Sequence, residues 1–264
     1  MIGQQSSVKV GDILREWRKV RRLSQMDLAL AANVSTRHLS FVETGRASPS
    51  DDLILRLSDA LQLPLRHVNA LLVAAGYAPR YTHWTLEDDK TGLIRAALEH
   101  LMARHAPYPA LVVNRTYDLV MINEGIIRLL TWLSEDGHLL AGYTNLFEMM
   151  FAPDGLRHYL VQWDVLQHQM LRRLYEESIA YQSEALTRLY QDCLAQSDPP
   201  PASTPHEADP AFPVMTLAFQ KGGRELHFFT AVTTFGTAMD VTIQELRIET
   251  FFPANAAAQQ FFTD

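Results

Sequence analysis

The sequence is poor in cysteine and has no long apolar run. Its 264 residues include a single cysteine, Cys193, so no internal disulfide can form. The N-terminus has no apolar stretch of the signal-peptide type, and no run approaches the roughly 18 apolar residues of a membrane span. We therefore expect a cytoplasmic protein that is not embedded in a membrane.

Sequence motifs of the common enzyme classes are also missing. There is no Gly-x-Ser-x-Gly nucleophile elbow, no phosphate-binding glycine loop and no zinc-protease helix motif. His100 and His105 stand five residues apart, and His158 and His168 stand ten apart, which are poor spacings for metal ligands on one helix. We therefore expect no catalytic activity, no metal site and no cofactor.

Charge is distributed unevenly along the chain. The net charge is -7, which by itself argues against a nucleic-acid partner. Residues 1–80, however, hold eleven Lys and Arg against seven Asp and Glu, whereas residues 81–264 hold twelve against twenty-three. This asymmetry indicates a basic, DNA-binding N-terminal part and an acidic remainder. The hydrophobic content of 47% is enough for a packed core.

Two short amphipathic helices are predicted in the stretch SQMDLALAANVSTRHLSFVETGR. Ser24 caps the first helix, with Asp27 three residues later as in a capping box. Asn33 lies at the sharp turn between them, where a positive φ favours glycine and tolerates asparagine. Ser35 caps the second helix, and Gly45 supplies the left-handed residue that ends it. These are the parts of a helix-turn-helix.

The second helix of such a unit enters the major groove of DNA. Arg37 has the most specific chemistry there, because a guanidinium can donate to both O6 and N7 of guanine, at ~1–3 kcal/mol of discrimination. Gln25 and Arg46 are expected to contact phosphate. The predicted DNA contacts are Ser24, Gln25, Ser35, Thr36, Arg37, His38, Ser40 and Arg46.

This part of the chain resembles the XRE family, the Cro and phage-repressor type of helix-turn-helix protein. The matching residues are SQMDLALAANVS, STRHLSFVETGRASPS and LILRLSDALQL, followed by a fifth helix, LRHVNALLVAAGYAPRY. Asn33 stands where that family usually has glycine. The resemblance implies a five-helix domain over residues 1–80 that binds double-stranded DNA. The alternative is a plain helical bundle whose arginines are solvated.

Composition changes after residue 76. The stretch GYAPRYTHWTLEDDK combines Gly, Pro and charge, so residues 81–104 are expected to form a linker and a connecting helix. ALVVNRTYDLVMIN then predicts a β-hairpin. A helical insertion is expected at about 124–195, with Asp154 as the cap of a long helix. Residues 196–210, rich in proline, predict an exposed loop.

The chain returns to β structure near its C-terminus. VMTLAFQKGGRELHFFTAVTTF predicts a hairpin that turns at Gly222 and Gly223, and DVTIQELRIETFF predicts a fifth strand with a bulge near Glu245. Together with the first hairpin, these strands make an antiparallel five-stranded sheet with helices on one side, which is typical of a PAS-like sensor. The predicted fold class is α+β.

Three stretches resemble the ligand-binding domain of MmyB-like transcription regulators. They are HAPYPALVVNRTYDLVMIN, DGLRHYLVQWDVLQHQMLRRL and ELHFFTAVTTFGTAMDVTIQELRIETFFPAN. With the XRE part, the resemblance covers about residues 11–256. It implies a bacterial one-component regulator whose PAS-like ligand-binding domain occupies residues 105–264, and it leaves the ligand open.

Aromatic and methionine side chains are dense in the expected sensor. Spaces between a sheet and its helices often bind small molecules, and methionine lines adaptable apolar pockets. A small apolar ligand such as a long-chain fatty acid would fit, with Arg157, His158 or Arg172 for a carboxylate. Each aromatic residue is alternatively ordinary core. The predicted ligand contacts are Phe147, Met150, Phe151, Arg157, Trp163, Phe229 and Phe235.

The sequence therefore predicts a DNA-binding transcription regulator, acting as a homodimer, whose ligand changes its affinity for an operator. Two other interpretations stay open. One is an antitoxin-like protein that neutralises a partner protein and binds no small molecule. The other is a haem or flavin sensor, which would be coloured when purified.

Overall fold

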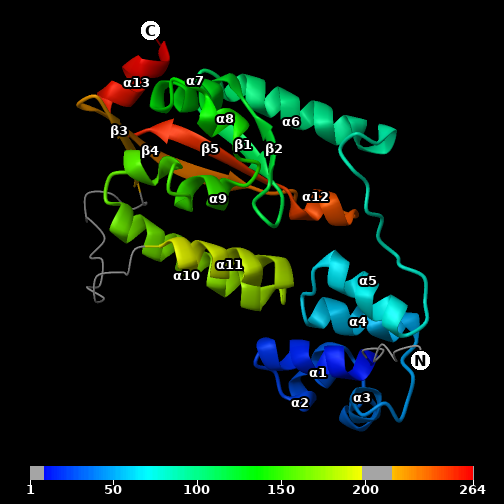
Figure 1. Ribbon diagram of the computed structural model, residues 1–264. Coiled ribbons are helices and arrows are strands. Elements are labelled where there is room, and N and C mark those ends of the chain that lie inside the picture. Colours follow the sequence, from blue (N-terminus) through cyan, green and yellow to red (C-terminus); the bar gives the residue numbers. More distant parts are fainter. Residues whose placement is uncertain (1–8, 198–215, 264) are drawn as a thin grey trace, which may run out of the picture. The chain divides into compact units, whose positions relative to one another are not determined.

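The computed structural model describes residues 9–197 and 216–263. These residues form two compact units (Figure 1). The first contains the chain up to Trp84 together with Gly236–Gln244, and the second contains Thr85–Phe235 and the residues from Glu245 onward. No helix of the described ranges is long and apolar enough to cross a membrane.

The first unit is a bundle of helices around one core. Its apolar residues recur at helical spacing, so that Leu14 and Trp17 of the first helix and Leu39 of the third are fully buried. The five predicted helices are confirmed, and they are α1 (Val10–Val20), α2 (Gln25–Ala31), α3 (Thr36–Glu43), α4 (Asp51–Ala60) and α5 (Leu65–Ala74).

Local signals set the ends of α2 and α3 as predicted. The Ser24 hydroxyl accepts from the Asp27 N–H at 3.1 Å, and the Asp27 carboxylate accepts from the Ser24 N–H at 3.0 Å, so the capping box is confirmed. The Ser35 hydroxyl caps α3. Asn33 and Gly45 have φ values of 51° and 72°, the left-handed backbone expected at the turn and at the end of α3.

The second unit is an α+β domain built on five antiparallel strands in the order β2-β1-β5-β4-β3. Both predicted hairpins are confirmed, and the second turns at Gly222 and Gly223. The strands are β1 (Ala110–Val113), β2 (Leu119–Ile122), β3 (Thr216–Lys221), β4 (Arg224–Thr233) and β5 (Arg247–Pro253). The helices are η1 (Asp89–Thr91), α6 (Gly92–His105), α7 (Glu124–Leu133), α8 (His138–Ala141), α9 (Leu146–Phe151), η2 (Leu156–Tyr159), α10 (Trp163–Ala180), α11 (Glu184–Gln196) and α13 (Ala256–Thr263). The helix α12 (Val241–Glu245) belongs to the first unit except for its last residue.

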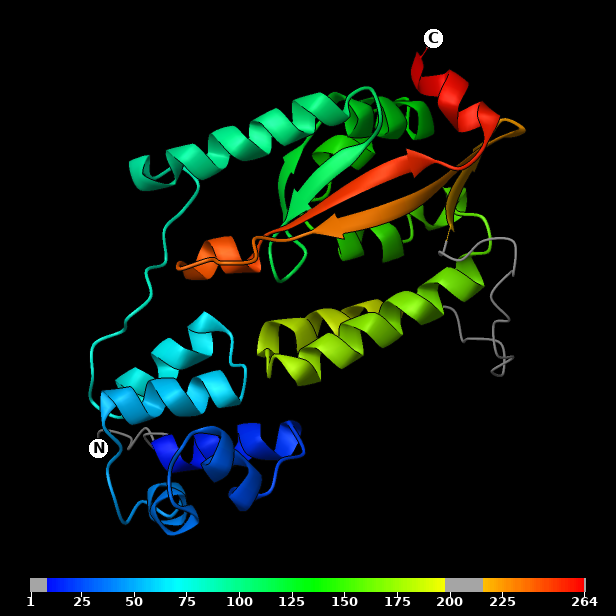
Figure 2. The same ribbon diagram turned by 180° about the vertical axis from the view of Figure 1, so that it is seen from behind.

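Helices pack on both faces of the sheet, so the expectation of helices on one side was wrong. Successive residues of a strand point to opposite faces. Val112 packs with Leu98 and Met102 of α6, whereas Leu111 and Val113 face the larger cluster formed with α7, α9, α10 and α11. Figure 2 shows α6 and the α10–α11 pair on opposite sides of the sheet. All of β1 is therefore buried.

The fifth strand is shorter than predicted, because its first half is the helix α12. Asp240 explains the difference: its carboxylate accepts hydrogen bonds from the N–H groups of Thr242 and Ile243, at 2.9 and 3.2 Å, and so caps a helical turn. This cap overrides the strand propensity of a β-branched run. The predicted bulge at Glu245 is a helix end instead.

The long helix of the insertion begins later than predicted. Asp154 does not cap it, because its carboxylate accepts a hydrogen bond from the Tyr143 hydroxyl at 2.5 Å. The 3₁₀ turn η2 follows, and Gln162, with a φ of 54°, precedes the first residue of α10. The helix α11 ends at Gln196. Most of the loop predicted at residues 196–210 lies outside the described residues.

Candidate DNA interface and ligand cavity

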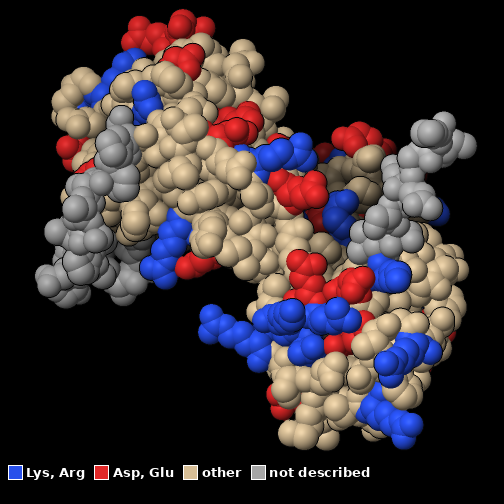
Figure 3. Space-filling view, turned by 60° about the horizontal axis from the view of Figure 1, so that its bottom comes forward, with Lys and Arg blue, Asp and Glu red and all other residues tan. Residues whose placement is uncertain are grey.

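The predicted DNA contacts lie at the start of α2, on α3 and at Arg46 just beyond it. Gln25 and Ser40 are half-buried. The other six are exposed: Ser24, Ser35, Thr36, Arg37, His38 and Arg46. Figure 3 shows several Lys and Arg side chains on the exposed surface of the first unit, with acidic side chains between some of them.

Phe41 brings two of the predicted contacts together. The centroid of its ring lies 5.4 Å from the guanidinium carbon of Arg37 and 6.0 Å from that of Arg46. Such cation–π contacts are worth about 0.5–1 kcal/mol at exposed sites. One aromatic ring on α3 therefore supports both the predicted base contact and the predicted phosphate contact.

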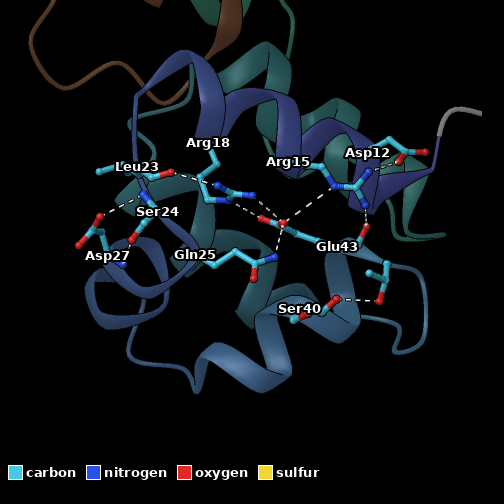
Figure 4. A network of polar contacts seen from close by, with 10 residues as sticks. Asp12, Arg15, Arg18, Leu23, Ser24, Gln25, Asp27, Ser40 and Glu43 are labelled. Atoms are coloured by element: carbon cyan, nitrogen blue, oxygen red, sulfur yellow. Dashed lines mark hydrogen bonds and ion pairs between the residues drawn. The ribbon is translucent and has the colours of Figure 1, made fainter.

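A buried carboxylate at the end of α3 holds that helix in place (Figure 4). Glu43 is 2% exposed. Arg18 of α1 donates two hydrogen bonds to its carboxylate, from Nε to Oε1 at 2.7 Å and from Nη2 to Oε2 at 2.9 Å. The side-chain amide of Gln25 in α2 donates to Oε2 at 2.8 Å. Arg15 donates to the backbone carbonyl of Glu43. The carboxylate therefore ties α1, α2 and α3 together.

The charge of Glu43 is stabilised by these partners. Burial by itself raises the pKa of this carboxyl, but the hydrogen bonds from Arg18 and Gln25 outweigh it, so the pKa lies below its ordinary value of 4.5. Gln25 was predicted to contact phosphate, and here its amide braces Glu43 instead, so the phosphate contact stays a prediction.

The second unit contains an apolar cavity of about 130 Å³. Its wall is built from the cavity-facing side of the sheet, including Leu111 of β1 and Phe251 of β5, and from α7, α8, α9 and α10. Phe147 and Met150 of α9 lie in this wall. Most of the lining is aliphatic or aromatic, so the cavity suits an apolar molecule.

Tyr117, Arg173 and Glu249 form a polar part of the cavity wall, and Tyr143 and Thr230 also line the cavity. Arg173 Nη2 lies 3.9 Å from Glu249 Oε1, and the Arg173 guanidinium carbon lies 5.5 Å from the centre of the Tyr117 ring. Behind them, the Tyr117 hydroxyl donates to Glu177 at 3.0 Å and accepts from Arg247 at 2.8 Å. The cavity wall is thus mostly apolar and includes one cluster of charged groups.

Burial shifts the pKa values of two of these groups. It raises the pKa of the Tyr117 hydroxyl, against the opposing charges of Arg247 and Arg173. It also raises the pKa of Glu249 above 4.5, although the same two guanidiniums act in the other direction. No group of three or more His, Cys, Asp or Glu that could hold a metal ion occurs within residues 9–197 and 216–263.

Each of the two units contains a region that matches a known protein family. Residues 94–263 match the MmyB-like transcription regulator ligand binding domain, and residues 14–68 match a helix-turn-helix domain. The chain belongs to the MmyB-like regulator family. The transcriptional regulator ClgR of two Mycobacterium tuberculosis strains, CDC 1551 / Oshkosh and ATCC 25618 / H37Rv, is 39% identical to it over 67 residues. That alignment covers 25% of this chain and 57% of ClgR, so the chain spans little more than half of those relatives.

Within this MmyB-like domain, the predicted ligand contacts do not all come together. Phe147 and Met150 line the cavity. Phe151 and Trp163 do not; their rings pack edge to face with centroids 4.9 Å apart in the neighbouring core. Arg157 also lies off the cavity wall and donates to the carbonyl of Gln196.

The two predicted contacts from the C-terminal strands and their connection also lie away from the cavity. Phe229 of β4 stacks on Phe252 of β5, with centroids 5.1 Å apart and planes at 13°. Phe235 packs against the cluster that contains Leu86 and Leu98 on the α6 side of the sheet. Neither residue lines the cavity. Phe229 precedes Thr230, which does, and successive residues of a strand point to opposite faces. Phe235 lies beyond the end of β4.

The candidate partners for a carboxylate lie outside the cavity wall. Arg172 is exposed and pairs with Glu176, and the His158 ring contacts the carbonyl of Pro153. Arg173, one residue along α10, is the arginine that lines the cavity. The positions that face inward on this helix could not be predicted reliably, since its start was predicted eight residues too early. Glu249 could have been found from the alternation of residues 247, 249 and 251 on one face of β5.

Proposed function

We propose that this protein is a one-component transcription regulator that binds double-stranded DNA as a homodimer and responds to a small amphipathic ligand. We place it in the cytoplasm because its partner is DNA. The domain limits follow the sequence: 1–80 for DNA binding, 81–104 as linker and connecting helix, and 105–264 for the PAS-like sensor. The observation that carries the proposal is the braced, outward α3, with Arg37 exposed, in one chain with an apolar cavity.

The geometry of α3 favours DNA reading over a plain helical bundle. A solvated surface helix needs no buried ion pair to fix its angle, whereas Glu43 is held by side chains of two other helices. Burying a carboxylate is costly unless it is fully paired, so this arrangement fixes the direction in which Arg37 points. That direction matters for bidentate contact with a guanine edge.

A dimer gives the sensor a way to act on DNA. Two recognition helices must lie about 34–36 Å apart to enter successive major grooves on one side of the duplex. A ligand that binds one arrangement of the dimer better than another shifts the population, and with it the affinity for the operator. The ligand must therefore discriminate between two states of the protein.

The cavity supports a ligand with a long apolar part, and a long-chain fatty acid is one example. Its volume of about 130 Å³ is close to that of a cavity that binds benzene, so a long chain requires the wall to adapt. Met149, Met150 and Met170 all line the cavity, and the flexible thioether side chain suits such adaptation.

The test begins with the protein purified from its native host. Organic extraction and mass spectrometry should release an amphipathic molecule, and adding that molecule should change the affinity of the protein for DNA upstream of its own gene. A coloured protein would favour a haem or flavin sensor instead. Recovery of a stable protein complex without DNA binding would favour the antitoxin-like alternative.

A further inference from the structure

Glu249 occupies an unusual position for a carboxylate. It lies in the middle of β5, a central strand, where it pairs with Leu111 of β1 on one side and Val232 of β4 on the other. It shares a face of the strand with Phe251, lines the apolar cavity and is 8% exposed. A carboxyl group in such surroundings is costly unless it has a partner.

The described part of the chain gives Glu249 one long ion pair but no hydrogen bond. Within residues 9–197 and 216–263, its carboxyl oxygens accept no hydrogen bond. The nearest cation is Arg173, at 3.9 Å, which is too long for a hydrogen bond. The Nε of Arg173 is directed to Glu177, at 3.3 Å. The free acceptor therefore faces the cavity.

The charges around Glu249 are already balanced. Arg173 and Glu177 come from α10, and Arg247 comes from β5. Arg247 Nη1 donates to both carboxyl oxygens of Glu177, at 3.0 and 2.9 Å, and to the neutral Tyr117 hydroxyl. Two guanidiniums thus face two carboxylates. The carboxylate of a ligand would add a third negative charge to these two arginines and two glutamates. The excess negative charge would be unfavourable at low dielectric.

We propose that Glu249 is the group that recognises the polar end of the ligand, and that it selects an uncharged end that donates a hydrogen bond, such as a hydroxyl or a primary amide. This inference rests on the proposed ligand function of the cavity. A fatty acid then binds as the neutral acid, whose hydroxyl donates to Glu249, and not as the carboxylate. Binding of a fatty acid is accordingly accompanied by uptake of a proton.

Three probes of equal chain length test the selection on the full-length protein. Calorimetric titrations at pH 8 would compare 1-decanol, which donates a hydrogen bond, with its methyl ether, which does not, and with decanoate, which is charged. We expect 1-decanol to bind about tenfold more tightly than either of the others. Decanoate should bind more tightly at pH 5.5 than at pH 8, because it can then enter as the acid.

A matched pair of variants connects the selection to this residue. Glu249→Gln removes the charge and keeps the shape, so decanoate should gain about tenfold in affinity at pH 8. Glu148→Gln makes the same change on α9 at an exposed side chain outside the cavity wall, and it should leave all affinities unchanged.

The outcomes separate this inference from the proposed function. If none of the probes binds, the cavity is not a ligand site, and both this inference and the ligand part of the proposed function fail. If wild-type protein binds decanoate at pH 8 as tightly as 1-decanol, the cavity is a ligand site but the role of Glu249 is refuted. The comparison of 1-decanol with its methyl ether uses wild-type protein only, so it decides the matter even where Glu249→Gln does not fold.

Discussion

Arg37 and Arg46 share the ring of Phe41, yet we expect them to respond differently to substitution. Arg37→Ala should weaken binding to the operator more than binding to random DNA, by about 1–3 kcal/mol at the preferred site, because it removes a base contact. Fluorescence anisotropy with both DNAs measures the difference. Equal losses on the two would show that Arg37 contacts only phosphate.

Arg46→Ala should weaken binding to all DNA sequences alike. Removal of one phosphate contact releases one fewer counterion, so the slope of log affinity against log salt should become shallower by about one unit. The measurement is a salt titration with operator and random DNA. An unchanged slope would contradict the assigned role.

Glu43 should contribute to folding stability in a pH-dependent way. Its pKa is lowered in the folded state, so its contribution is complete above the ordinary value of 4.5 and is lost as the pH falls through the folded-state pKa. Glu43→Gln should lower the free energy of unfolding of the helical unit by about 3 kcal/mol at pH 7, because Arg18 loses its buried partner. The difference from wild type should shrink as the pH falls below 4.5 and through the lowered pKa of Glu43.

Amide hydrogen exchange in α1 and α3 reports this loss within the full-length protein. Glu16→Gln is the matched control, because Glu16 is exposed on the same helix α1. Equal protection of α1 and α3 in wild type and Glu43→Gln at pH 7 would show that the network does not stabilise the unit.

At the residue scale, sequence patterns found what depends on local chemistry. The caps at Ser24 and Ser35 and the left-handed Asn33 were predicted correctly, because each involves backbone groups within a few positions. Glu43 was missed because its partners lie on other helices. For Glu249, the alternation of β5 indicates the face on which it lies but not its neighbour Arg173 on α10. Spacing within one segment does not reveal such partners.

At the element scale, the distance between two packed helices can depend on a single residue. Gly11 of α1 lies so close to α3 that an added Cβ would sit 2.5 Å from the carbonyl oxygen of Val42 and 2.7 Å from that of Glu43. Backbone atoms cannot move aside cheaply. Gly11→Ala should therefore lower the free energy of unfolding by about 1–3 kcal/mol, despite the better helix propensity of alanine.

Gly92→Ala on α6 is the matched control. A Cβ there meets no atom within 4 Å, so the substitution should be neutral or slightly stabilising. Thermal unfolding of the two variants and the wild type makes the comparison. A Gly11→Ala protein as stable as wild type would mean that α1 and α3 do not pack at the observed distance.

At the element scale, long periodic segments were predictable and short or capped ones were not. The five N-terminal helices and both hairpins follow from periodicity and turn residues. The helix α12 was missed because Asp240 caps a β-branched run, and α6 was not assigned to the second face of the sheet because periodicity does not tell which face a helix covers.

At the scale of the whole molecule, the two family resemblances predicted the order of the units, and the structure supplied the ligand cavity. The family matches cover residues 14–68 and 94–263. Coupling between DNA and ligand has to be reciprocal: a ligand that lowers operator affinity must itself bind less tightly when the operator is present. Calorimetric titration of ligand with and without operator DNA should give the same ratio as the two DNA titrations.

The proposed function requires that α3 reads the sequence of DNA. The most direct measurement is the affinity of the full-length protein for the DNA upstream of its own gene, compared with random DNA of equal length at the same salt concentration. If α3 reads DNA, the wild type should bind the upstream DNA more tightly, and Arg37→Ala should lose most of that preference. Equal affinity of the wild type for both DNAs, with and without host lipid extract, would contradict it.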